Sequence, residues 1–388
     1  MRILLFSEKS DHTRRLIQHV LAPLGYEIIL LHQAYWESDT IEAYQKSGVS
    51  VIIESPDLLH WKRIKTKLGK CYAIYRDISN RIKKFQPDAV MIQYVNALPA
   101  VEAIFAAGHS RRLILGFWGS DLLRQKKRIC LRLIYPLALK RADVVTFDSL
   151  NMLECLHGLY GKKYDYKVRM MRYYNPTIDL LPLLKKQYTR EEMRACLGLP
   201  QDGRILLSVG YNGNDAHNHL KITQAIAALP QNLQKKIFLI YPMTYGVQDE
   251  DYYNKVDAAR EKLFCESVVL QNYLTRKECS FLYLSVDVFV HAQNSDAYSQ
   301  TFVDYIYSGV TVFQANWLHY PEIDRYGLKL YEFADYQELT HLLMDYLNEF
   351  PGRCLKQTAE AIEILRKTES TAKITKNMKS IVEGDSNV

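Results

Sequence analysis

Short apolar runs alternate with longer helical patterns along most of the chain, and this alternation constrains the fold more than any other feature. The runs are rich in β-branched residues and are apolar throughout, as expected for strands that helices cover on both faces. The pattern therefore predicts parallel sheets with covering helices. The runs span residues 2–7, 28–31, 49–53, 89–93, 113–117, 144–147 and 168–171, then 205–209, 237–241, 268–270, 286–291, 310–313 and 328–331.

The runs fall into two sets, which are separated by the turn-forming sequence Tyr174-Asn175-Pro176-Thr177. After it, Thr189 is placed to cap a new amphipathic helix that carries Glu191 and Glu192 in its first turn. A chain of 388 residues also exceeds one ordinary hydrophobic core. We predict an α/β protein of two Rossmann-like lobes whose parallel sheets face a central cleft. The expected segments are residues 1–175, 176–350 and 351–388, the last being helices that pack back on the first lobe, with a polar tail.

Composition and the N-terminus indicate a cytoplasmic protein. Hydrophobic residues make up 48% and charged residues 24%, as in soluble globular proteins. No apolar run reaches the roughly eighteen residues of a spanning helix, and residues 1–15 resemble a first strand rather than a signal peptide. The seven cysteines form no CxxC pair or zinc-like cluster, which is typical of free thiols in a reducing compartment.

Several motifs of nucleotide and hydrolase chemistry are absent from the sequence. The first strand is followed by Glu8-Lys9-Ser10-Asp11, so the glycine-rich turn of dinucleotide-binding proteins is missing. The P-loop motif GxxxxGK[ST] and the nucleophile-elbow motif GxSxG do not occur either. These absences disfavour dehydrogenases, P-loop NTPases and α/β-hydrolases.

The most informative stretch is HAQNSDAYSQTFVDYIYSGVTVF, residues 291–313. It predicts a strand end, a polar loop and a helix that begins near Ser299 and stops at Gly309. Backbone N–H groups of Ser299, Gln300 and Thr301 would then lie at a helix N-terminus, where a diphosphate is favourable. Asp296 in the loop and Asp304 in the helix could accept hydrogen bonds from sugar and ribose hydroxyls. Two ordinary aspartates near a helix start are the alternative interpretation.

This stretch resembles the sugar-nucleotide signature of retaining GT-B glycosyltransferases, in which two acidic residues, usually glutamates, are separated by seven residues. In that family the first contacts the donor sugar and the second the ribose, and here both are aspartates. The phrases at 204–210, 270–292, 85–93 and 141–149 also resemble strands of the two GT-B lobes. The resemblance covers most of the chain from about residue 85 to 345. It implies a GT-B fold and glycosyl transfer.

The rest of the donor site follows from the same resemblance. The family often has an arginine and a lysine for the donor phosphates after Gly210, but the arginine is missing here. The loop is also partly similar to a bacterial transferase that adds Fuc4NAc to a lipid-linked intermediate. For each donor residue named in the next sentence, the alternative interpretation is an ordinary polar position in a loop or turn. The expected donor ligands are Asn212 and Gly213 for close approach, His217, His219 or Lys221 for positive charge, Tyr241 in the similar segment, and Gln271 and Tyr273 near the base.

Acceptor binding is predicted in the first lobe, where Trp118 and Asp121 follow a buried strand. Asp121 would deprotonate or orient the acceptor hydroxyl, or else cap a helix, and Trp118 would stack on a sugar or pack in the core. Ser10 would complete the wall. Next comes the basic run 124–141, in which Arg124, Lys126 and Lys127 are placed for an acceptor pyrophosphate. Three interpretations of this run stay open: a solvated helix face, a surface that binds anionic lipid, or a patch that binds nucleic acid. No nucleic-acid recognition module accompanies the run.

Together these features predict a glycosyltransferase that acts in bacterial surface polysaccharide synthesis. The expected donor is a UDP-, GDP- or dTDP-sugar, and the acceptor is a glycan or a polyprenyl-pyrophosphate-linked sugar. We expect no metal, no further cofactor and no nucleic acid partner. We also expect the reaction to retain the configuration of the sugar. The protein is expected in the cytoplasm, peripherally at the inner face of the plasma membrane. The alternatives are a GT-B-like sugar-nucleotide epimerase or phosphorylase and a non-catalytic sugar-nucleotide-binding subunit.

Overall fold

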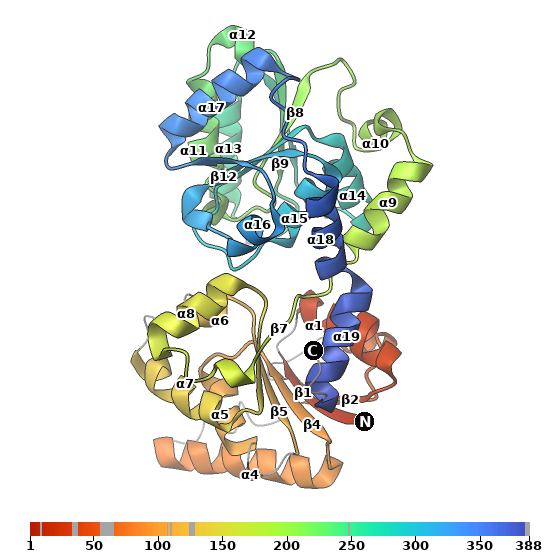
Figure 1. Ribbon diagram of the computed structural model, residues 1–388, viewed down its shortest axis with the longest axis vertical. Coiled ribbons are helices and arrows are strands. Elements are labelled where there is room, and N and C mark those ends of the chain that lie inside the picture. The colour runs from red at the N-terminus through yellow and green to blue at the C-terminus, as the bar shows by residue number, and fades with distance from the viewer. Residues whose placement is uncertain are drawn as a thin grey trace. The chain divides into compact units, whose positions relative to one another are not determined.

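The structure is a computed structural model that describes residues 1–7, 10–32, 38–54, 66–106, 108, 111–123, 129–246 and 249–384 (Figure 1). The chain forms two compact units, Met1–Tyr174 with Thr368–Val388 and Asn175–Lys367. The boundary between the two units after Tyr174 thus falls one residue before the boundary that we expected after residue 175. Residues 351–367 lie in the second unit, whereas we expected a separate segment from residue 351 onwards.

The first unit is built on a seven-stranded parallel sheet with the order β3-β2-β1-β4-β5-β6-β7. Because β1 pairs with both β2 and β4, the strand order reverses between β1 and β4. The predicted strands of this half are confirmed to within two residues. They are β1 (Arg2–Ser7), β2 (Glu27–His32), β3 (Val51–Glu54), β4 (Ala89–Gln93), β5 (Leu113–Phe117), β6 (Val144–Phe147) and β7 (Val168–Met170).

Helices connect these strands, and one of them comes from the far end of the chain. Helix α19 (Thr371–Glu383) contributes Ile374, Met378 and Ile381 to the core that Ile17 and Val20 also enter. A C-terminal helix that packs back on the first lobe agrees with the expectation for residues 351–388, although the helix occupies residues that we had assigned to a polar tail. The other helices are α1 (Asp11–Leu16), η1 (Ile17–Leu21), η2 (Ala22–Leu24), α2 (Ser38–Lys46), α4 (Lys67–Phe85), α5 (Ala97–Ala106), α6 (Ser120–Leu123), α7 (Ile129–Arg141), α8 (Leu150–Tyr160) and η4 (Asp165–Lys167).

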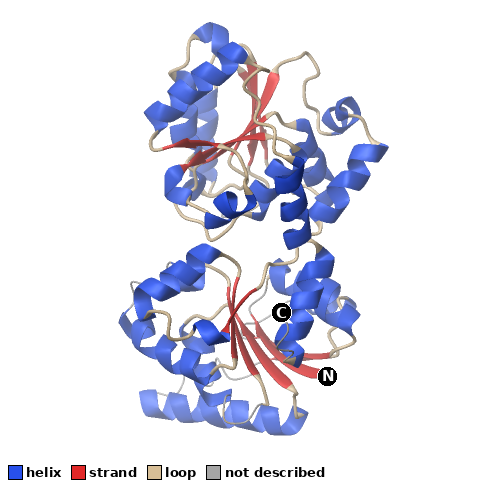
Figure 2. Cartoon of the chain, in the orientation of Figure 1, coloured by secondary structure: helices blue, strands red, loops and turns tan. Residues whose placement is uncertain are grey.

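The second unit has a six-stranded parallel sheet with the order β10-β9-β8-β11-β12-β13. Helices again flank the sheet (Figure 2). The strands are β8 (Ile205–Val209), β9 (Ile237–Pro242), β10 (Glu266–Leu270), β11 (Val288–His291), β12 (Thr311–Ala315) and β13 (Tyr331–Phe333). The helices are α9 (Thr177–Gln187), α10 (Arg190–Cys196), η5 (Asp215–His217), α11 (His219–Ala227), α12 (Gln231–Gln234), α13 (Glu250–Arg260), α14 (Arg276–Ser285), α15 (Gln300–Ser308), η6 (Asn316–Leu318), α16 (Pro321–Tyr326), α17 (Tyr336–Glu349) and α18 (Ala359–Glu369).

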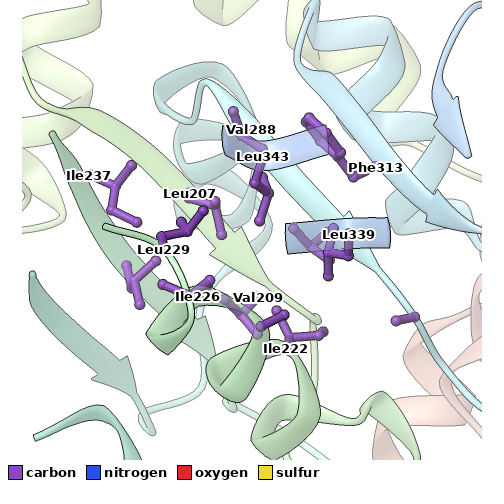
Figure 3. Packing of buried hydrophobic residues seen from close by; sticks show 14 of the residues in the cluster. Leu207, Val209, Ile222, Ile226, Leu229, Ile237, Val288, Phe313, Leu339 and Leu343 are labelled. Atoms are coloured by element: carbon purple, nitrogen blue, oxygen red, sulfur yellow. The ribbon is translucent and has the colours of Figure 1, made fainter. Parts of the chain in front are cut away.

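The strands of this second sheet are apolar throughout because each face meets its own core. On one face Leu207 and Val209 pack with Ile222 and Leu339 from the helices (Figure 3). The neighbouring Leu206 points to the opposite core. Alternate residues of one strand are therefore buried on opposite sides, as the uninterrupted apolar runs predicted.

Local signals fix the helix ends that frame the site described below. Thr189 caps α10, as expected from the sequence, and it also forms a capping box with Glu192. At α15 the Ser299 hydroxyl accepts from the N–H of Phe302, and Gly309 ends the helix with φ 90°. Both ends of α15 confirm the prediction. Across the described part of the chain, no helix has the length and apolar content to cross a membrane.

Candidate active site

The candidate site lies where the loops after β8 and β11 leave the second sheet. Strand β8 pairs with β9 on one side and β11 on the other, so the chain reverses direction across the sheet between β8 and β11. Ligands of open α/β sheets bind at this kind of switch point, beyond the carboxyl ends of the strands. The loop 210–218 and the loop 292–299 meet there, and the N–H of Asn294 donates to the carbonyl of Ala216 over 2.8 Å.

Asp296 is the partly exposed carboxylate of this site. Its Oδ1 accepts from the N–H of Ala297 at 2.7 Å. The Tyr211 hydroxyl lies 3.2 Å from Oδ2 and 3.0 Å from Oε1 of Gln293.

A second tyrosine also contacts the Asp296 carboxylate. Tyr320 is fully buried and hydrogen-bonds to Asp296, and its hydroxyl lies 3.0 Å from Nε2 of His291. Burial first, and then the negative charge of Asp296, raise the pKa of Tyr211 and Tyr320 well above the ordinary phenol value. Both phenols therefore keep their protons at neutral pH and can act as donors. We name Tyr211 and Tyr320 with Asp296 the tyrosine clamp.

The N-cap of α15 lies three residues after Asp296. Ser299 caps the helix and also hydrogen-bonds to Tyr211, which links the clamp to the helix start. Thr301 in the first turn hydrogen-bonds to Tyr245, whose hydroxyl also contacts Asn212. Orphan N–H groups and the helix dipole make such a terminus favourable for a phosphate. The structure thus brings together four predicted donor residues, namely Asn212, Asp296, Ser299 and Thr301, with partly exposed Gln300 adjoining them.

Asp304 differs from Asp296 in its surroundings. It is only 4% exposed, and its Oδ1 accepts from the side-chain amide of Asn175 at 2.7 Å. This bond ties the first residue of the second unit to α15. Contact between Asp304 and a ribose stays a prediction, because a ribose hydroxyl would have to share the carboxylate with Asn175.

The expected positive charge of His217 and His219 was wrong. Both rings are buried, and burial lowers the pKa of His217 to about 2 and that of His219 to about 4. The buried His291 beside them has its pKa lowered to about 3 for the same reason. These three rings are neutral at pH 7, so they support the loop after β8 by packing rather than by binding phosphate. Gly210 adopts φ 65°, and a side chain there would collide with His219.

Three other predicted donor residues have structural contacts of their own. Tyr241 is a core residue whose hydroxyl bonds Thr223, so its assignment to the donor was wrong. Lys221 lies over the ring of Tyr336 in a separate groove of about 730 Å³ between α11 and α17, which contradicts a role at the phosphates. A side chain at Gly213 would overlap Tyr253, and close approach of a ligand to this glycine stays a prediction.

Gln271 and Tyr273 are exposed on the loop after β10, the edge strand. Tyr273 is 74% exposed, so its ring is open to stacking. Their contact with the base stays a prediction, since β10 lies two strands from β8.

Asp121 in the first unit is a structural carboxylate, and its assignment as a catalytic base was wrong. It is fully buried and accepts from the backbone N–H groups of Val95, Trp118 and Gly119 at 2.8–3.0 Å. Burial raises its pKa to about 6, although these bonds act in the opposite direction. A carboxylate enclosed in this way holds the loops after β4 and β5 together and does not reach an acceptor hydroxyl.

Trp118 is the centre of an aromatic group at the carboxyl edge of the first sheet. Its ring lies 5.8 Å from His12, 5.8 Å from Tyr94 and 5.5 Å from Tyr173. Its indole N–H donates to Gln93 over 2.7 Å, and Trp118 is partly exposed rather than a core residue. His12 is exposed beside it. We name these four rings the aromatic group; half-exposed aromatic faces of this kind can pack against sugar rings.

Two further acceptor predictions have different outcomes. Ser10 caps α1, where its hydroxyl accepts from the N–H of Thr13 at 3.1 Å, and its backbone bonds Tyr44. It is a helix cap that adjoins the aromatic group through His12. Arg124, Lys126 and Lys127 lie outside the described residues.

The prediction missed most of the residues that build the site. Tyr211, Tyr320 and Tyr245 in the second unit, and Tyr94 and Tyr173 in the first, were not distinguished among 28 tyrosines. One signal was available for two of them, because Tyr211 and Tyr94 follow closely on the ends of strands. In the described ranges, no three His, Cys, Asp or Glu side chains are grouped to hold a metal ion.

Comparisons with known proteins agree with this architecture. Residues 2–149 match the family model described as Glycosyl transferase 4-like. Among solved structures, HepE from Anabaena in complex with UDP and glucose is 14% identical with a TM-score of 0.71, covering 99% of this chain and 100% of that one. WaaG, a glycosyltransferase involved in lipopolysaccharide biosynthesis, is 14% identical with a TM-score of 0.62 and covers 99% and 100%.

A protein of another activity has a similar fold. The UDP-GlcNAc 2-epimerase from Neisseria meningitidis, bound to UDP-GlcNAc, is 11% identical with a TM-score of 0.59 and covers 99% of each chain. The sequence matches no curated protein. The chain thus has the two-domain GT-B fold, and the match of residues 2–149 to the Glycosyl transferase 4-like model agrees with the predicted glycosyltransferase class.

Proposed function

We propose that the protein transfers a sugar from a nucleotide-diphosphate donor to a hydroxyl of a glycan or lipid-linked acceptor. The observation that carries this proposal is the placement of Asp296. It is a partly exposed carboxylate, oriented by Tyr211, three residues before the N-cap of α15 and at the switch point of the second sheet. A sugar ligand and an anionic ligand would therefore be bound side by side.

On the donor side, the first turn of α15 would bind the diphosphate through backbone N–H groups and the helix dipole. Asp296 would accept hydrogen bonds from hydroxyls of the donor sugar. As the bond to the sugar breaks, negative charge grows on the departing nucleotide diphosphate, and donors already oriented towards it stabilise that charge. The proposed donors are UDP-, GDP- or dTDP-sugars, and HepE, which was solved with UDP and glucose, supports this class.

On the acceptor side, the aromatic group around Trp118 would pack against sugar rings of a glycan. Asp121 would act only through the loops that it fixes, because Trp118 and Gly119 donate their N–H groups to it. Catalysis on this side is then positioning of the acceptor hydroxyl, which can supply a large share of a rate enhancement.

The finer chemistry belongs to the same proposal. Transfer without a metal is consistent with phosphate binding by helix N–H groups. The support for retention of configuration is the resemblance of residues 296–304 to the signature of retaining enzymes. A role in bacterial surface polysaccharide synthesis, with a lipid-linked acceptor at the inner face of the plasma membrane, draws support from the likeness to WaaG.

The proposal can be tested with purified protein and a panel of UDP-, GDP- and dTDP-sugars. Binding is measured first by thermal shift, and nucleotide release is then measured with and without glycan or lipid-linked acceptors. We expect one donor class to raise the Tm and to release nucleotide only when an acceptor is present. If no sugar nucleotide binds, the proposed donor site is wrong.

A second candidate function is epimerisation of a sugar nucleotide. The fold-wide similarity to the UDP-GlcNAc 2-epimerase favours it. The same panel separates the two functions, because an epimerase converts the sugar without an acceptor. Chromatography of the sugar nucleotide after incubation alone would reveal the epimer.

A further inference from the structure

Helix α7 of the first unit is apolar on two opposite faces. Leu131, Tyr135 and Leu139 are buried, and the Tyr135 hydroxyl donates to the carbonyls of Val95 and Asp121. This face anchors the helix. A surface helix of a soluble protein normally has a polar face opposite its buried one.

The outer face of α7 instead exposes a stripe of large apolar side chains. Ile129 is 76% exposed, Leu133 69% and Leu137 55%. They recur every four residues, so they lie along one side of the helix. Three large aliphatic side chains in one row form an apolar patch of the kind that marks an interaction site.

Positive charge surrounds this stripe. Exposed Arg132, Lys140 and Arg141 lie on α7 itself, which contains no acidic residue. The segment after α8 packs on α7, since Tyr164 donates to the carbonyl of Pro136 and Lys167 to that of Lys140. In Figure 1, α8 lies beside α7 in the same unit.

That neighbouring segment extends the charged border. Lys162 and Lys163 are exposed, and Tyr166 is 73% exposed. The adjacent acidic Asp165 lies 2.7 Å from His157, and Glu154 on α8 is exposed. Cations thus outnumber acidic groups around the stripe.

We propose that this surface, formed by the outer face of α7 with Lys162, Lys163 and Tyr166, docks on an anionic phospholipid bilayer. Aliphatic side chains would enter the interface between headgroups and acyl chains, Lys and Arg would contact lipid phosphates, and Tyr166 would lie at headgroup level. An acidic protein would satisfy the charges, but a bilayer satisfies both the charges and the straight apolar stripe. At thirteen residues α7 is too short to span a membrane, so the contact is peripheral.

The evidence for this docking surface is the exposure and the charge of its side chains. It does not depend on the lipid-linked acceptor of the proposed function. The two can therefore fail independently. Vesicle binding needs no donor, and transfer to a soluble acceptor needs no vesicle.

The experiment is co-sedimentation of the full chain with vesicles of phosphatidylcholine alone or with one quarter phosphatidylglycerol. We expect binding only to the anionic vesicles, and weaker binding at high salt. Leu133→Gln/Leu137→Gln should weaken it at least tenfold, and Lys140→Gln/Arg141→Gln should weaken it about fivefold for each charge removed. Leu183→Gln is the matched control, because this leucine is 56% exposed on α9 in the other unit.

Three outcomes would overturn the proposal. The wild type could fail to bind anionic vesicles, or the leucine variant could bind them as strongly as the wild type. Sedimentation velocity could instead show self-association that the leucine variant loses, which would assign the face to a second copy of the chain. Unchanged Tm and far-UV circular dichroism of each variant exclude misfolding as the cause of any loss.

Discussion

The hydroxyl of Tyr211 lies 3.2 Å from Oδ2 of Asp296, although 85 residues separate them in the chain. This contact joins the loop after β8 to the loop after β11. It orients the carboxylate that the proposed reaction depends on, and it couples the effects of the two residues on activity.

Asp296→Asn should abolish most of the sugar transfer without unfolding the protein. The amide retains the size of the carboxylate but loses the charge, and a charge-assisted hydrogen bond contributes about 1.5–3 kcal/mol. We expect kcat/KM to fall by about 10–150-fold for each sugar hydroxyl bond lost. Steady-state kinetics with the donor found in the panel measures this fall. Asp324→Asn, an exposed residue of α16, is the control, and equal losses in both variants would contradict the assignment.

Tyr211→Phe should disturb the orientation of Asp296 while leaving its charge in place. One hydrogen bond to a carboxylate is removed, so we expect kcat/KM to fall by about 10-fold and less than in Asp296→Asn. Adding Tyr211→Phe to Asp296→Asn should cause little further loss, because the tyrosine acts through the carboxylate. A double-mutant cycle tests this, and additive losses would show that Tyr211 acts independently of Asp296.

The three buried histidines should make the second unit sensitive to acid. The folded pKa values of His217, His291 and His219 are about 2, 3 and 4, below the ordinary 6.5. At a pH between each folded pKa and 6.5, the unfolded chain therefore binds more protons than the folded chain. Their contribution to stability is complete above pH 6.5 and is lost as the pH falls. Each histidine lowers the free energy of unfolding by up to about 1.4 kcal/mol per pH unit over this range.

Urea unfolding of wild type and His217→Gln between pH 4 and pH 7 measures this effect. Glutamine does not titrate, so the variant should show a pH slope smaller by about 1.4 kcal/mol per unit. The exposed His341→Gln is the control and should keep the wild-type slope. An unchanged slope in His217→Gln would mean that His217 is not buried in its neutral form.

Asp121 should have the opposite dependence on pH in the first unit. Its folded pKa of about 6 lies above the ordinary 3.8, so its contribution is complete below pH 3.8 and is lost as the pH rises through 6. The difference amounts to about 3 kcal/mol. Asp121→Asn should therefore be most destabilising near pH 4 and less so at pH 7.

Chemical unfolding at several pH values, followed by a probe in the first unit such as Trp118 fluorescence, measures this trend. Asp143→Asn is the matched control, because that exposed carboxylate accepts from a single backbone N–H, that of Leu113. A destabilisation by Asp121→Asn that stays constant with pH would contradict the raised pKa.

Much of the fold could be predicted because its signals are local. A strand covered on both faces must be apolar throughout, and this requirement marked β1, β4, β5, β6 and β8 to the residue. Caps behave in the same way, since Ser299 and Gly309 act within one turn of the helix ends that they form. The extent of helix α19 was not predicted, because its apolar residues are few and their burial depends on a core that is distant in the sequence.

The chemistry of individual side chains was less predictable because it depends on burial and on distant partners. Whether a histidine is charged depends on the water around it, and for His217 and His219 the surrounding packing removes that water. From the sequence, Asp121 was equally suited to cap a helix or to act as a base, but in the structure four backbone N–H groups donate to its carboxylate. Lys221 follows the same loop as His217 but faces a different groove.

The sequence alone determined the alternation of strands and helices, the two sheets and the loop–helix element that begins at Asp296, because apolar periodicity and capping act over a few residues. Only the tertiary structure decided which polar groups meet a ligand. It buried Asp121 and the histidines, left Asp296 partly exposed, and placed Tyr211 against it. Such contacts arise where segments remote in sequence converge at the ends of parallel strands, and local sequence patterns do not encode which residues will meet there.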